Sequence, residues 1–353
     1  MTGNRDGNPH GTGLSPATMR DVAERAGVST ATVSRYLAGQ SVRAADVVAE
    51  AIEELGFRPN PIAQRLSSGS TMACALVVPD ITNPFFSAVV RGVEEVARAA
   101  GYDLVLYNTD EDPELEAHII EQLRSRVDGV LIAPTSESES GPGLDLLERL
   151  EVPIVLLDRE APALEGHDSV KVDNAGGVRQ AIDHLVGLGH RRIGLVAGPL
   201  GSTPGRERYE GSLAALEAHD IELEPMLIEN GGFKEDGGYQ AMLRLLALSA
   251  IPTAVFIHNN LMTIGALRAM RDMAIRIPQD VSVIGFDDHV FANLLTPPLT
   301  VVSRPTVEQG ILAMRLLLNR FNPEYSAPSR RLILETNLTV RQSTSVPHVR
   351  DDK

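Results

Sequence analysis

Residues 18–39 read TMRDVAERAGVSTATVSRYLAG, and they indicate two short helices separated by a tight turn. The first helix is predicted over 19–26, with its apolar side chains on one face. Thr18 and Asp21 have the spacing of a capping box, in which each side chain accepts a hydrogen bond from the backbone of the other residue. Gly27 then supplies a turn that is tight enough to pack a second helix closely against the first.

The second helix is predicted to begin after Ser29, a residue type that caps helix N-termini well. Its sequence mixes hydroxyl groups and one arginine with apolar side chains. Two closely packed helices, the second with short polar side chains, suit a helix-turn-helix that reads a DNA major groove. The spacing alone also fits an ordinary αα-hairpin.

Further segments carry a family resemblance. AGVS (26–29), TVSR (32–35), AIEELGFRPN (51–60) and PIAQRL (61–66) resemble the DNA-binding headpiece of the lactose-repressor family of bacterial transcription regulators, and the similarity continues through nearly the entire chain. The resemblance implies a homodimer that binds double-stranded operator DNA, with base reading by Thr30, Ala31 and Arg35. The full set of DNA contacts that it implies is Thr30, Ala31, Thr32, Ser34, Arg35, Asn60 and Leu66.

A linker follows the headpiece. The segment RPNPIAQRLSSGST (58–71) contains two prolines and one short helical turn over 62–66, which is too short to be stable alone in water. In the family this turn is the hinge helix, which orders on DNA and pairs with its dimer mate in the minor groove. Leu66 matches the leucine that wedges between base steps and kinks the duplex. An exposed linker leucine is the alternative.

The net charge of −15 is unusual for a DNA-binding protein, so the distribution of charge matters. Residues 18–66 carry six arginines and six acidic residues, which makes the headpiece neutral. The third helix opens with Ala44-Ala45, where the family usually has Thr-Arg, and this weakens the case for phosphate contacts there. We therefore expect modest non-specific affinity and a shallow dependence on salt.

Composition excludes several classes of protein. The chain has 353 residues and one cysteine, Cys74, which excludes an internal disulfide and gives no metal cluster. The N-terminus lacks the apolar stretch of a signal peptide, and no apolar run approaches the roughly 20 residues that span a bilayer, so we expect a cytoplasmic protein. The motifs HExxH, GxSxG and Walker A are missing from the sequence. We therefore expect no catalytic residue, no cofactor and no bound metal.

From Met72 onward, short apolar strands alternate with amphipathic helices such as 86–100 and 175–188. The strands are predicted at 73–78, 104–107, 129–132, 154–157, 192–197, 254–257 and 281–285. This alternation predicts an α/β fold of two lobes, with parallel sheets that helices cover on both faces. The resemblance implies a two-lobed core like the type I periplasmic binding proteins, in which the chain crosses between lobes near 171–173, 302–305 and 331–336.

The predicted organisation therefore has five parts. They are a disordered tail (1–17), an all-α helix-turn-helix headpiece (18–58), a hinge helix and linker (59–71), a two-lobed effector-binding and dimerisation domain (72–345) and a second tail (346–353).

Polar and aromatic side chains gather at the ends of the predicted strands, where open parallel sheets bind ligands. Carboxylates accept hydrogen bonds from hydroxyl groups, arginine and asparagine donate them, and flat rings pack on the C–H face of a sugar. By resemblance, the effector-binding residues are Asn83, Phe86, Asp158, Arg159, Arg206, Phe233, Asn259, Asp287 and Arg304. Phe85 is expected in the hydrophobic core. The alternatives are a structural ion pair between Asp158 and Arg159 and a helix cap at Asp287.

Arg304 stands where many relatives carry a pocket glutamine. A further buried cation favours an anionic effector, such as a sugar acid or sugar phosphate, unless Arg304 pairs with Asp158 or Asp287. The predicted function is a repressor that a small carbohydrate-like effector releases from a pseudo-palindromic operator. The alternatives are a co-repressor mechanism and a cytoplasmic sugar sensor that acts through protein partners.

Overall fold

The computed structural model describes residues 17–37, 40–58, 70–135 and 141–348. The chain forms two compact units, Met1–Thr71 and Met72–Lys353. We call the first unit the headpiece and the second unit the core.

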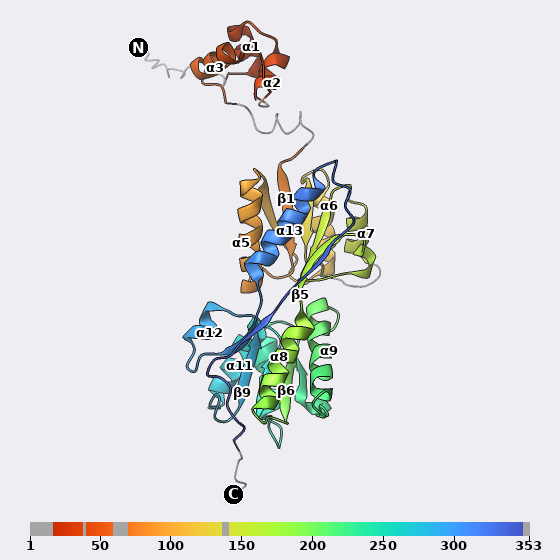
Figure 1. Ribbon diagram of the computed structural model, residues 1–353, viewed down its shortest axis with the longest axis vertical. Helices are drawn as coiled ribbons and strands as arrows, with labels where there is room; N and C mark the ends of the chain where they lie inside the picture. The colour runs from red at the N-terminus through yellow and green to blue at the C-terminus, as the bar shows by residue number, and fades with distance from the viewer. Residues whose placement is uncertain (1–16, 38–39, 59–69, 136–140, 349–353) are drawn as a thin grey trace, which may run out of the picture. The chain divides into compact units, whose positions relative to one another are not determined.

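The described part of the headpiece consists of three short helices (Figure 1). They are α1 (Met19–Ala26), α2 (Thr30–Leu37) and α3 (Ala45–Glu54). The helices close over a small core in which Val22, Val33 and Val48 are fully buried. Each helix is too short to be stable alone, so this shared apolar contact holds the headpiece together.

Local hydrogen bonds fix the helix-turn-helix. Thr18 and Asp21 form the predicted capping box at the start of α1, and Gly27 ends that helix with a φ of 66°. Ser29 caps α2 because its hydroxyl oxygen accepts a hydrogen bond from the backbone N–H of Thr32 at 3.2 Å. The bounds of the first two helices therefore follow from local sequence signals, as predicted.

The core has two lobes, each built on one six-stranded sheet. The sheet of the first lobe has the order β11 (Arg331–Leu334), β5 (Asp168–Val172), β4 (Ile154–Leu157), β3 (Gly129–Ile132), β1 (Ala73–Val78) and β2 (Asp103–Asn108). The sheet of the second lobe has the order β12 (Asn337–Thr339), β10 (Thr300–Ser303), β9 (Ser282–Phe286), β8 (Ala254–Ile257), β6 (Ile193–Ala197) and β7 (Ile228–Asn230). Neighbouring strands pair in parallel, except that β12 runs antiparallel to β10.

Helices cover both faces of each sheet (Figure 1). In the first lobe, α5 (Pro84–Ala99) and α13 (Thr306–Arg320) pack on one face, and α6 (Pro113–Leu123) and α7 (Pro142–Glu148) pack on the other. In the second lobe, α8 (Asn174–Gly187) and α9 (Thr203–Glu217) pack on one face, and α10 (Glu235–Leu246) and α11 (Asn260–Asp272) pack on the other. The remaining described elements are the short α12 (Val290–Leu294), η1 (Pro162–Leu164) and η2 (Pro225–Leu227). The predicted α/β class is confirmed.

The chain crosses between the lobes three times. It passes from β5 to α8 at residue 173, from β10 to α13 at 304–305, and from β11 to β12 at 335–336. These crossings lie at or next to the positions that the resemblance implied, so each lobe is discontinuous in sequence.

Five described strands lie outside the seven predicted ranges: β5, β7, β10, β11 and β12. β5 reads DSVKV, and it is buried although it contains Asp168 and Lys171, because both side chains form ion pairs. β7, β11 and β12 lie at sheet edges and are only partly buried, so they lack a continuous apolar run. The seven predicted strands are found to within one residue at each end.

The strand order of each sheet contains a switch point, where ligands commonly bind. In the first lobe β1 lies between β2 and β3, and in the second lobe β6 lies between β7 and β8. In each sheet, the second strand in chain order thus lies on one side of the first strand, and the third lies on the other side. Open α/β sheets bind ligands at such a switch point, outside the carboxyl ends of the strands.

Candidate functional sites

The surface of α2 presents four of the predicted DNA contacts. Thr30, Ala31, Ser34 and Arg35 are exposed, whereas Val33 is buried and anchors the helix. The Nε of Arg35 donates to the carbonyl oxygen of Ala31 at 3.4 Å, which leaves the rest of the guanidinium on the surface. Base contacts by these four residues stay a prediction.

The structure does not show the other three predicted DNA contacts, Thr32, Asn60 and Leu66, as exposed residues of α2. Thr32 is half-buried, and its hydroxyl lies 2.9 Å from the hydroxyl of Ser29. It is therefore part of the N-terminal cap of α2. Asn60 and Leu66 lie outside the described residues, so their roles stay predictions.

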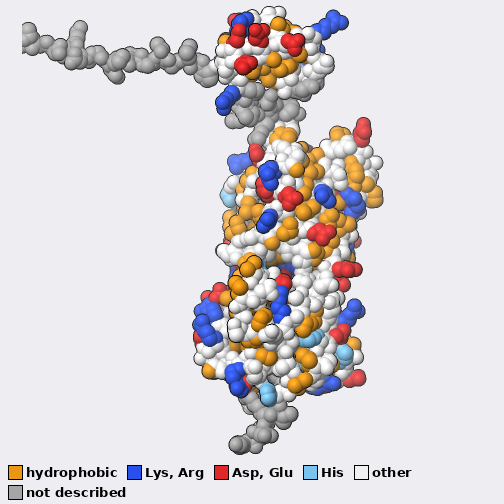
Figure 2. Space-filling view, turned by 60° about the vertical axis from the view of Figure 1, so that its left-hand side comes forward, with side chains coloured by type: hydrophobic (Ala, Val, Ile, Leu, Met, Phe, Trp, Pro, Cys, Tyr) orange, Lys and Arg blue, Asp and Glu red, His pale blue; other side chains and the backbone are white. Residues whose placement is uncertain are grey.

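Two of the headpiece arginines form ion pairs within the headpiece. Arg20 pairs with Glu24 at 3.4 Å along α1, and Arg25 pairs with Glu54 of α3 at 2.5 Å. Acidic side chains also gather on the headpiece face that Figure 2 shows. Ala44 gives α3 no side-chain cap. These observations agree with the expectation of weak non-specific attraction to DNA.

In the core, a pocket forms between the carboxyl ends of the two sheets, and we call it the cleft. Its lining from the first lobe is Asp80, Asn83, Phe85, Phe86, Glu111, Asp158 and Arg159. Its lining from the second lobe is Pro204, Arg208, Phe233, Lys234, Asn259 and Asp287, and Arg304 comes from the crossing after β10. Eight of the nine predicted effector-binding residues thus lie together, which makes the cleft the candidate ligand site.

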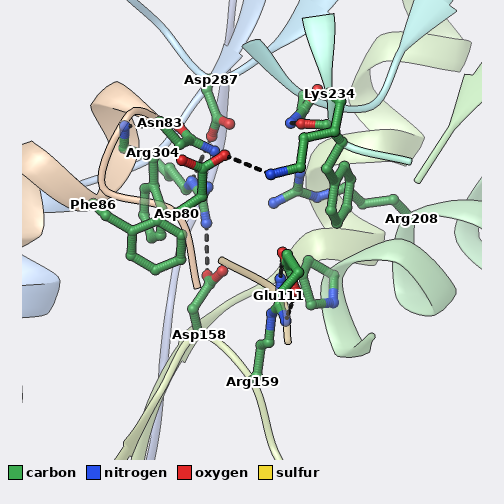
Figure 3. A pocket seen from close by; sticks show the side chains of 14 residues that line it. Asp80, Asn83, Phe86, Glu111, Asp158, Arg159, Arg208, Lys234, Asp287 and Arg304 are labelled. Atoms are coloured by element: carbon green, nitrogen blue, oxygen red, sulfur yellow. Dashed lines mark hydrogen bonds and ion pairs between the residues drawn. The ribbon is translucent and has the colours of Figure 1, made fainter. Parts of the chain in front are cut away.

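Arg304 lies between two carboxylates from different lobes (Figure 3). Its Nε donates to Oδ1 of Asp287 at 2.5 Å, and its Nη1 donates to Oδ1 of Asp158 at 2.6 Å. All three side chains are at most 6% exposed. Burial alone would lower the pKa of Arg304, but the two carboxylates outweigh burial and raise it. The alternative in which Arg304 pairs with these aspartates is therefore the one that the structure shows.

The alternative roles of the aspartates do not hold. Asp158 pairs with Arg304 and not with Arg159, whose guanidinium instead forms two hydrogen bonds with Glu111 at 2.6 and 2.8 Å. Asp287 does not cap a helix, because α12 begins after His289. Both aspartates have a positive φ, 65° at Asp158 and 78° at Asp287, a strained conformation that is often found at ligand sites.

One predicted residue was wrong. Arg206 lies in α9 and not in a loop, and it lines a different pocket beside Glu160 and Arg331. Arg208, two residues further along the same helix, lines the cleft instead. Side chains two positions apart on a helix point in directions roughly 200° apart, so only one of the two can face the cleft.

Arg208 is fully buried, with its guanidinium 3.6 Å above the ring of Phe286. Its Nε donates to Asn174 at 2.8 Å and its Nη1 donates to the carbonyl oxygen of His258 at 2.5 Å. Burial, together with the positive charge of Arg304, lowers the pKa of Arg208 to about 10, so it remains a cation at neutral pH. Its Nη2 has no hydrogen-bond partner among the described residues.

The amides of the cleft are partly committed to structure. Asn83 caps α5, and its Oδ1 also accepts a hydrogen bond from Asn260 of the second lobe at 3.0 Å. Asn259 caps α11, and its Nδ2 donates to the carbonyl oxygen of Phe233 at 3.3 Å. Asn259 and Phe233, both predicted effector contacts of the second lobe, therefore hold each other in place at the edge of the cleft.

Of the adjacent rings Phe85 and Phe86, Phe85 was expected in the core. It is 3% exposed and belongs to the hydrophobic core of the first lobe, but its face also carries the guanidinium of Arg304 at 3.5 Å. Phe86, the predicted ligand contact, packs edge-on against Phe85 and lines the cleft as well. Both rings therefore belong to the cleft.

Four further residues line the cleft that were not predicted from the sequence: Asp80, Glu111, Arg208 and Lys234. Lys234 of the second lobe pairs with Asp80 of the first lobe at 3.1 Å. Burial and hydrogen bonds act in opposite directions on Asp80, and the hydrogen bonds from Thr82 and Lys234 prevail and lower its pKa. Asp80 directly follows β1 in the segment VVPD, so its position at a strand end was a usable signal. The partner of Glu111 depends on tertiary contacts that no local pattern shows.

The cleft is electrically balanced. Four cations line it, Arg159, Arg208, Lys234 and Arg304, and four carboxylates line it, Asp80, Glu111, Asp158 and Asp287. The surplus positive charge on which the expectation of an anionic effector rested is therefore missing from the lining. Asp287 Oδ2, like Arg208 Nη2, is buried without a hydrogen-bond partner among the described residues.

Comparisons with known proteins agree with both parts of the chain. The model of bacterial regulatory proteins of the lacI family matches residues 18–60, and that of the periplasmic binding protein-like domain matches residues 182–344. The ribose operon repressor of Escherichia coli (strain K12) is 37% identical over 309 residues, which cover 86% of this chain and 93% of the relative. The transcriptional repressor PurR of Haemophilus influenzae (strain PittEE) is 33% identical over 334 residues, or 93% and 98% of the two chains.

The chain belongs to the lacI family. A solved lac repressor dimer, bound to operator and the anti-inducer ONPF, resembles it with a TM-score of 0.82 and 27% identity, over 94% of this chain and 100% of the other. As a lacI-family member the protein is a DNA-binding transcription regulator, and its relatives are repressors and not enzymes. Within the described part of the chain, no helix has the length and apolar character to cross a membrane.

Proposed function

We propose that this lacI-family regulator is a homodimeric, cytoplasmic repressor that a small, neutral, polyhydroxylated effector releases from a pseudo-palindromic operator. The effector binds in the cleft between the lobes of the core. A ribose operon repressor is among the relatives, which supports a carbohydrate-like effector.

The observation that carries this proposal is a pair of unused hydrogen-bonding atoms in the cleft. Arg208 Nη2 is a donor and Asp287 Oδ2 is an acceptor, and both are buried without a partner among the described residues. Leaving such groups unpaired is costly, so a native structure that contains them calls for an explanation. A hydroxyl group can accept from Arg208 while another donates to Asp287, as in a sugar with neighbouring hydroxyl groups.

The charge of the cleft supports a neutral effector. Its four cations face four carboxylates, and three of the cations form direct ion pairs with carboxylates of the lining. A charged effector would have to compete with these internal pairs, whereas a neutral polyol only needs donors and acceptors. The aromatic rings of Phe86 and Phe233 supply flat surfaces for its C–H groups.

Release follows from the position of the cleft between the lobes. A ligand that contacts Asp158 of the first lobe and Asp287 of the second favours one relative orientation of the lobes. The equilibrium shifts only by the difference in binding free energy between the two orientations. The three crossing segments are the places where the chain must bend when the orientation changes.

A thermal-shift screen of neutral sugars, sugar acids and sugar phosphates tests the effector class. A true effector at 100 times its Kd should add about 2.7 kcal/mol to the free energy of unfolding. The hit is then added to the protein on operator DNA, and fluorescence anisotropy should show release. Stronger DNA binding would indicate a co-repressor instead, and a screen in which only acids or phosphates bind would refute the proposal of a neutral effector.

A further inference from the structure

Arg304 joins the lobes from the inside of the cleft. It directly follows β10, where the chain leaves the second lobe, and it is held by Asp287 of the second lobe and Asp158 of the first lobe. Because both hydrogen bonds join charged groups in a buried site, they are strong and poorly screened by salt. We call this three-residue contact the inter-lobe clasp.

The clasp occupies the space that a ligand would need. The Cζ atom of Arg304 lies 3.5 Å from the centre of the Phe85 ring. The guanidinium lies between the two aspartates (Figure 3). The remaining cavity in the cleft is about 30 Å³, whereas small-molecule sites generally have about 300–1,000 Å³. A monosaccharide therefore cannot enter while the lobes and Arg304 keep this arrangement.

Other contacts across the cleft are weaker or more exposed. Lys234 pairs with Asp80 at 3.1 Å, but its side chain is 46% exposed and open to solvent and salt. Asn260 donates to Asn83 at 3.0 Å, which is a bond between neutral groups. Among these contacts, only the clasp combines full burial with opposite charges.

We propose that Arg304 is a specificity-determining residue that takes the place of ligand hydroxyl groups between Asp158 and Asp287. The clasp holds the lobes closed without a ligand, and a neutral sugar binds only by displacing the guanidinium. The apparent affinity for such a sugar is then reduced by the fraction of molecules in which the clasp is open. The ligand class rests on the proposed function, whereas closure by the clasp does not.

Spin labels on the two lobes test closure in the full-length protein. Glu121→Cys on α6 and Glu217→Cys on α9 place labels at exposed sites, and the native Cys74 is buried. The ligand-free protein should show one narrow distance distribution that D-ribose does not shorten. In Arg304→Gln the distribution should broaden and move to a different mean, because the amide loses the charge that holds both carboxylates.

Calorimetric titration with D-ribose tests the consequence for binding. Arg304→Gln should bind D-ribose at least tenfold more tightly than the unmodified protein. Arg320→Gln is the matched control, because Arg320 pairs with Asp168 away from the cleft, and it should leave the affinity unchanged. Arg304→Lys keeps the charge but cannot reach both carboxylates through separate N–H groups, so it should give an intermediate affinity.

Two results would contradict the proposed role of the clasp. One is a clear shift of the label distance to a closed state when D-ribose is added to the protein with Arg304 intact. The other is an affinity of Arg304→Gln no higher than that of the unmodified protein. If neither protein binds any sugar, the proposed effector fails, but the ligand-free label distances still decide whether Arg304 closes the lobes. If the Arg304 variants do not fold, the first result alone decides.

Discussion

Asp158 and Asp287 occupy equivalent places in the two lobes and share one arginine. Each follows the fourth strand of its sheet in chain order, each has a positive φ, and each accepts a hydrogen bond from Arg304 through Oδ1. The backbone N–H of each also donates to the neighbouring strand, at Val170 and Val302. The two sheet ends thus present matching carboxylates to the cleft.

Because the two aspartates are equivalent, substitution of either one should destabilise the protein by a similar amount. Asp158→Asn and Asp287→Asn should each lower the free energy of unfolding by roughly 1.5–3 kcal/mol, because each replaces a buried, charged acceptor of Arg304 by a neutral amide oxygen. Chemical denaturation would measure the change. Asp272→Asn, which removes an exposed carboxylate beside Arg271, should change stability little. Equal effects at all three positions would contradict this account.

Arg208 should be needed for the response to the effector. Arg208→Gln removes the unpaired Nη2 and its charge, so effector binding should weaken by roughly 1.5–3 kcal/mol. Operator affinity without effector should be unchanged. Titration calorimetry and DNA anisotropy separate the two quantities. Arg206→Gln is the control on the same helix, and a larger effect from it than from Arg208→Gln would assign Arg206 to the effector site instead of Arg208.

On the DNA side, Arg35 is the exposed residue of α2 that can grip a guanine edge with two hydrogen bonds. Arg35→Ala should weaken specific binding by about 1–3 kcal/mol and relax the preference at one base pair of each half-site. Binding to a set of operator variants would measure both effects. A uniform loss on every sequence would instead make Arg35 a phosphate contact.

Helices α5 and α13 approach each other through two glycines. A Cβ at Gly310 would lie 2.3 Å from the carbonyl oxygen of Val89, and a Cβ at Gly92 would lie 2.1 Å from that of Val307. Gly310→Ala should therefore force the helices apart and destabilise the fold by about 1–3 kcal/mol. Gly187→Ala, which meets open space at the end of α8, should be neutral or stabilising. Thermal unfolding of the two variants would show whether close packing matters here.

Buried histidines predict a loss of stability in mild acid. Burial, with the charge of Arg208, lowers the pKa of His258 from 6.5 to about 3, and burial also lowers the pKa of His190. The unfolded chain binds these protons first, so stability is intact above pH 6.5 and falls below it. Each histidine contributes a slope of up to about 1.4 kcal/mol per pH unit. Denaturation at pH 5 to 8 should show a shallower slope for His258→Gln, and an unchanged slope would exclude His258 as a cause.

Local signals in the sequence were sufficient for the first two helices and for seven of the described strands. Thr18, Asp21 and Gly27 define the first helix through their own backbone contacts, and apolar runs mark the central strands. Most residues of the cleft could be predicted because they follow strands, and the carboxyl ends of parallel strands meet at one edge of the sheet. These inferences need only short-range information.

Tertiary contacts decide the rest. Arg206 and Arg208 are both near the start of α9, and choosing between them requires the orientation of that helix on its sheet. The partners of Arg304 come from positions 146 and 17 residues away in sequence. Whether a buried arginine binds a ligand anion or a protein carboxylate depends on such distant neighbours, and the sequence alone left both possibilities open.

The three chain crossings have a practical consequence for dissecting the protein. The second lobe is an insertion between β5 and α13 of the first, and its edge strand β12 is supplied by the chain after it has returned to β11. A fragment that stops at residue 173 lacks α13 and β11, so it leaves the core face beneath α13 bare to water. Neither lobe can therefore be expressed as one continuous stretch, and a stop codon before the end of β11 at residue 334 should leave both lobes incomplete.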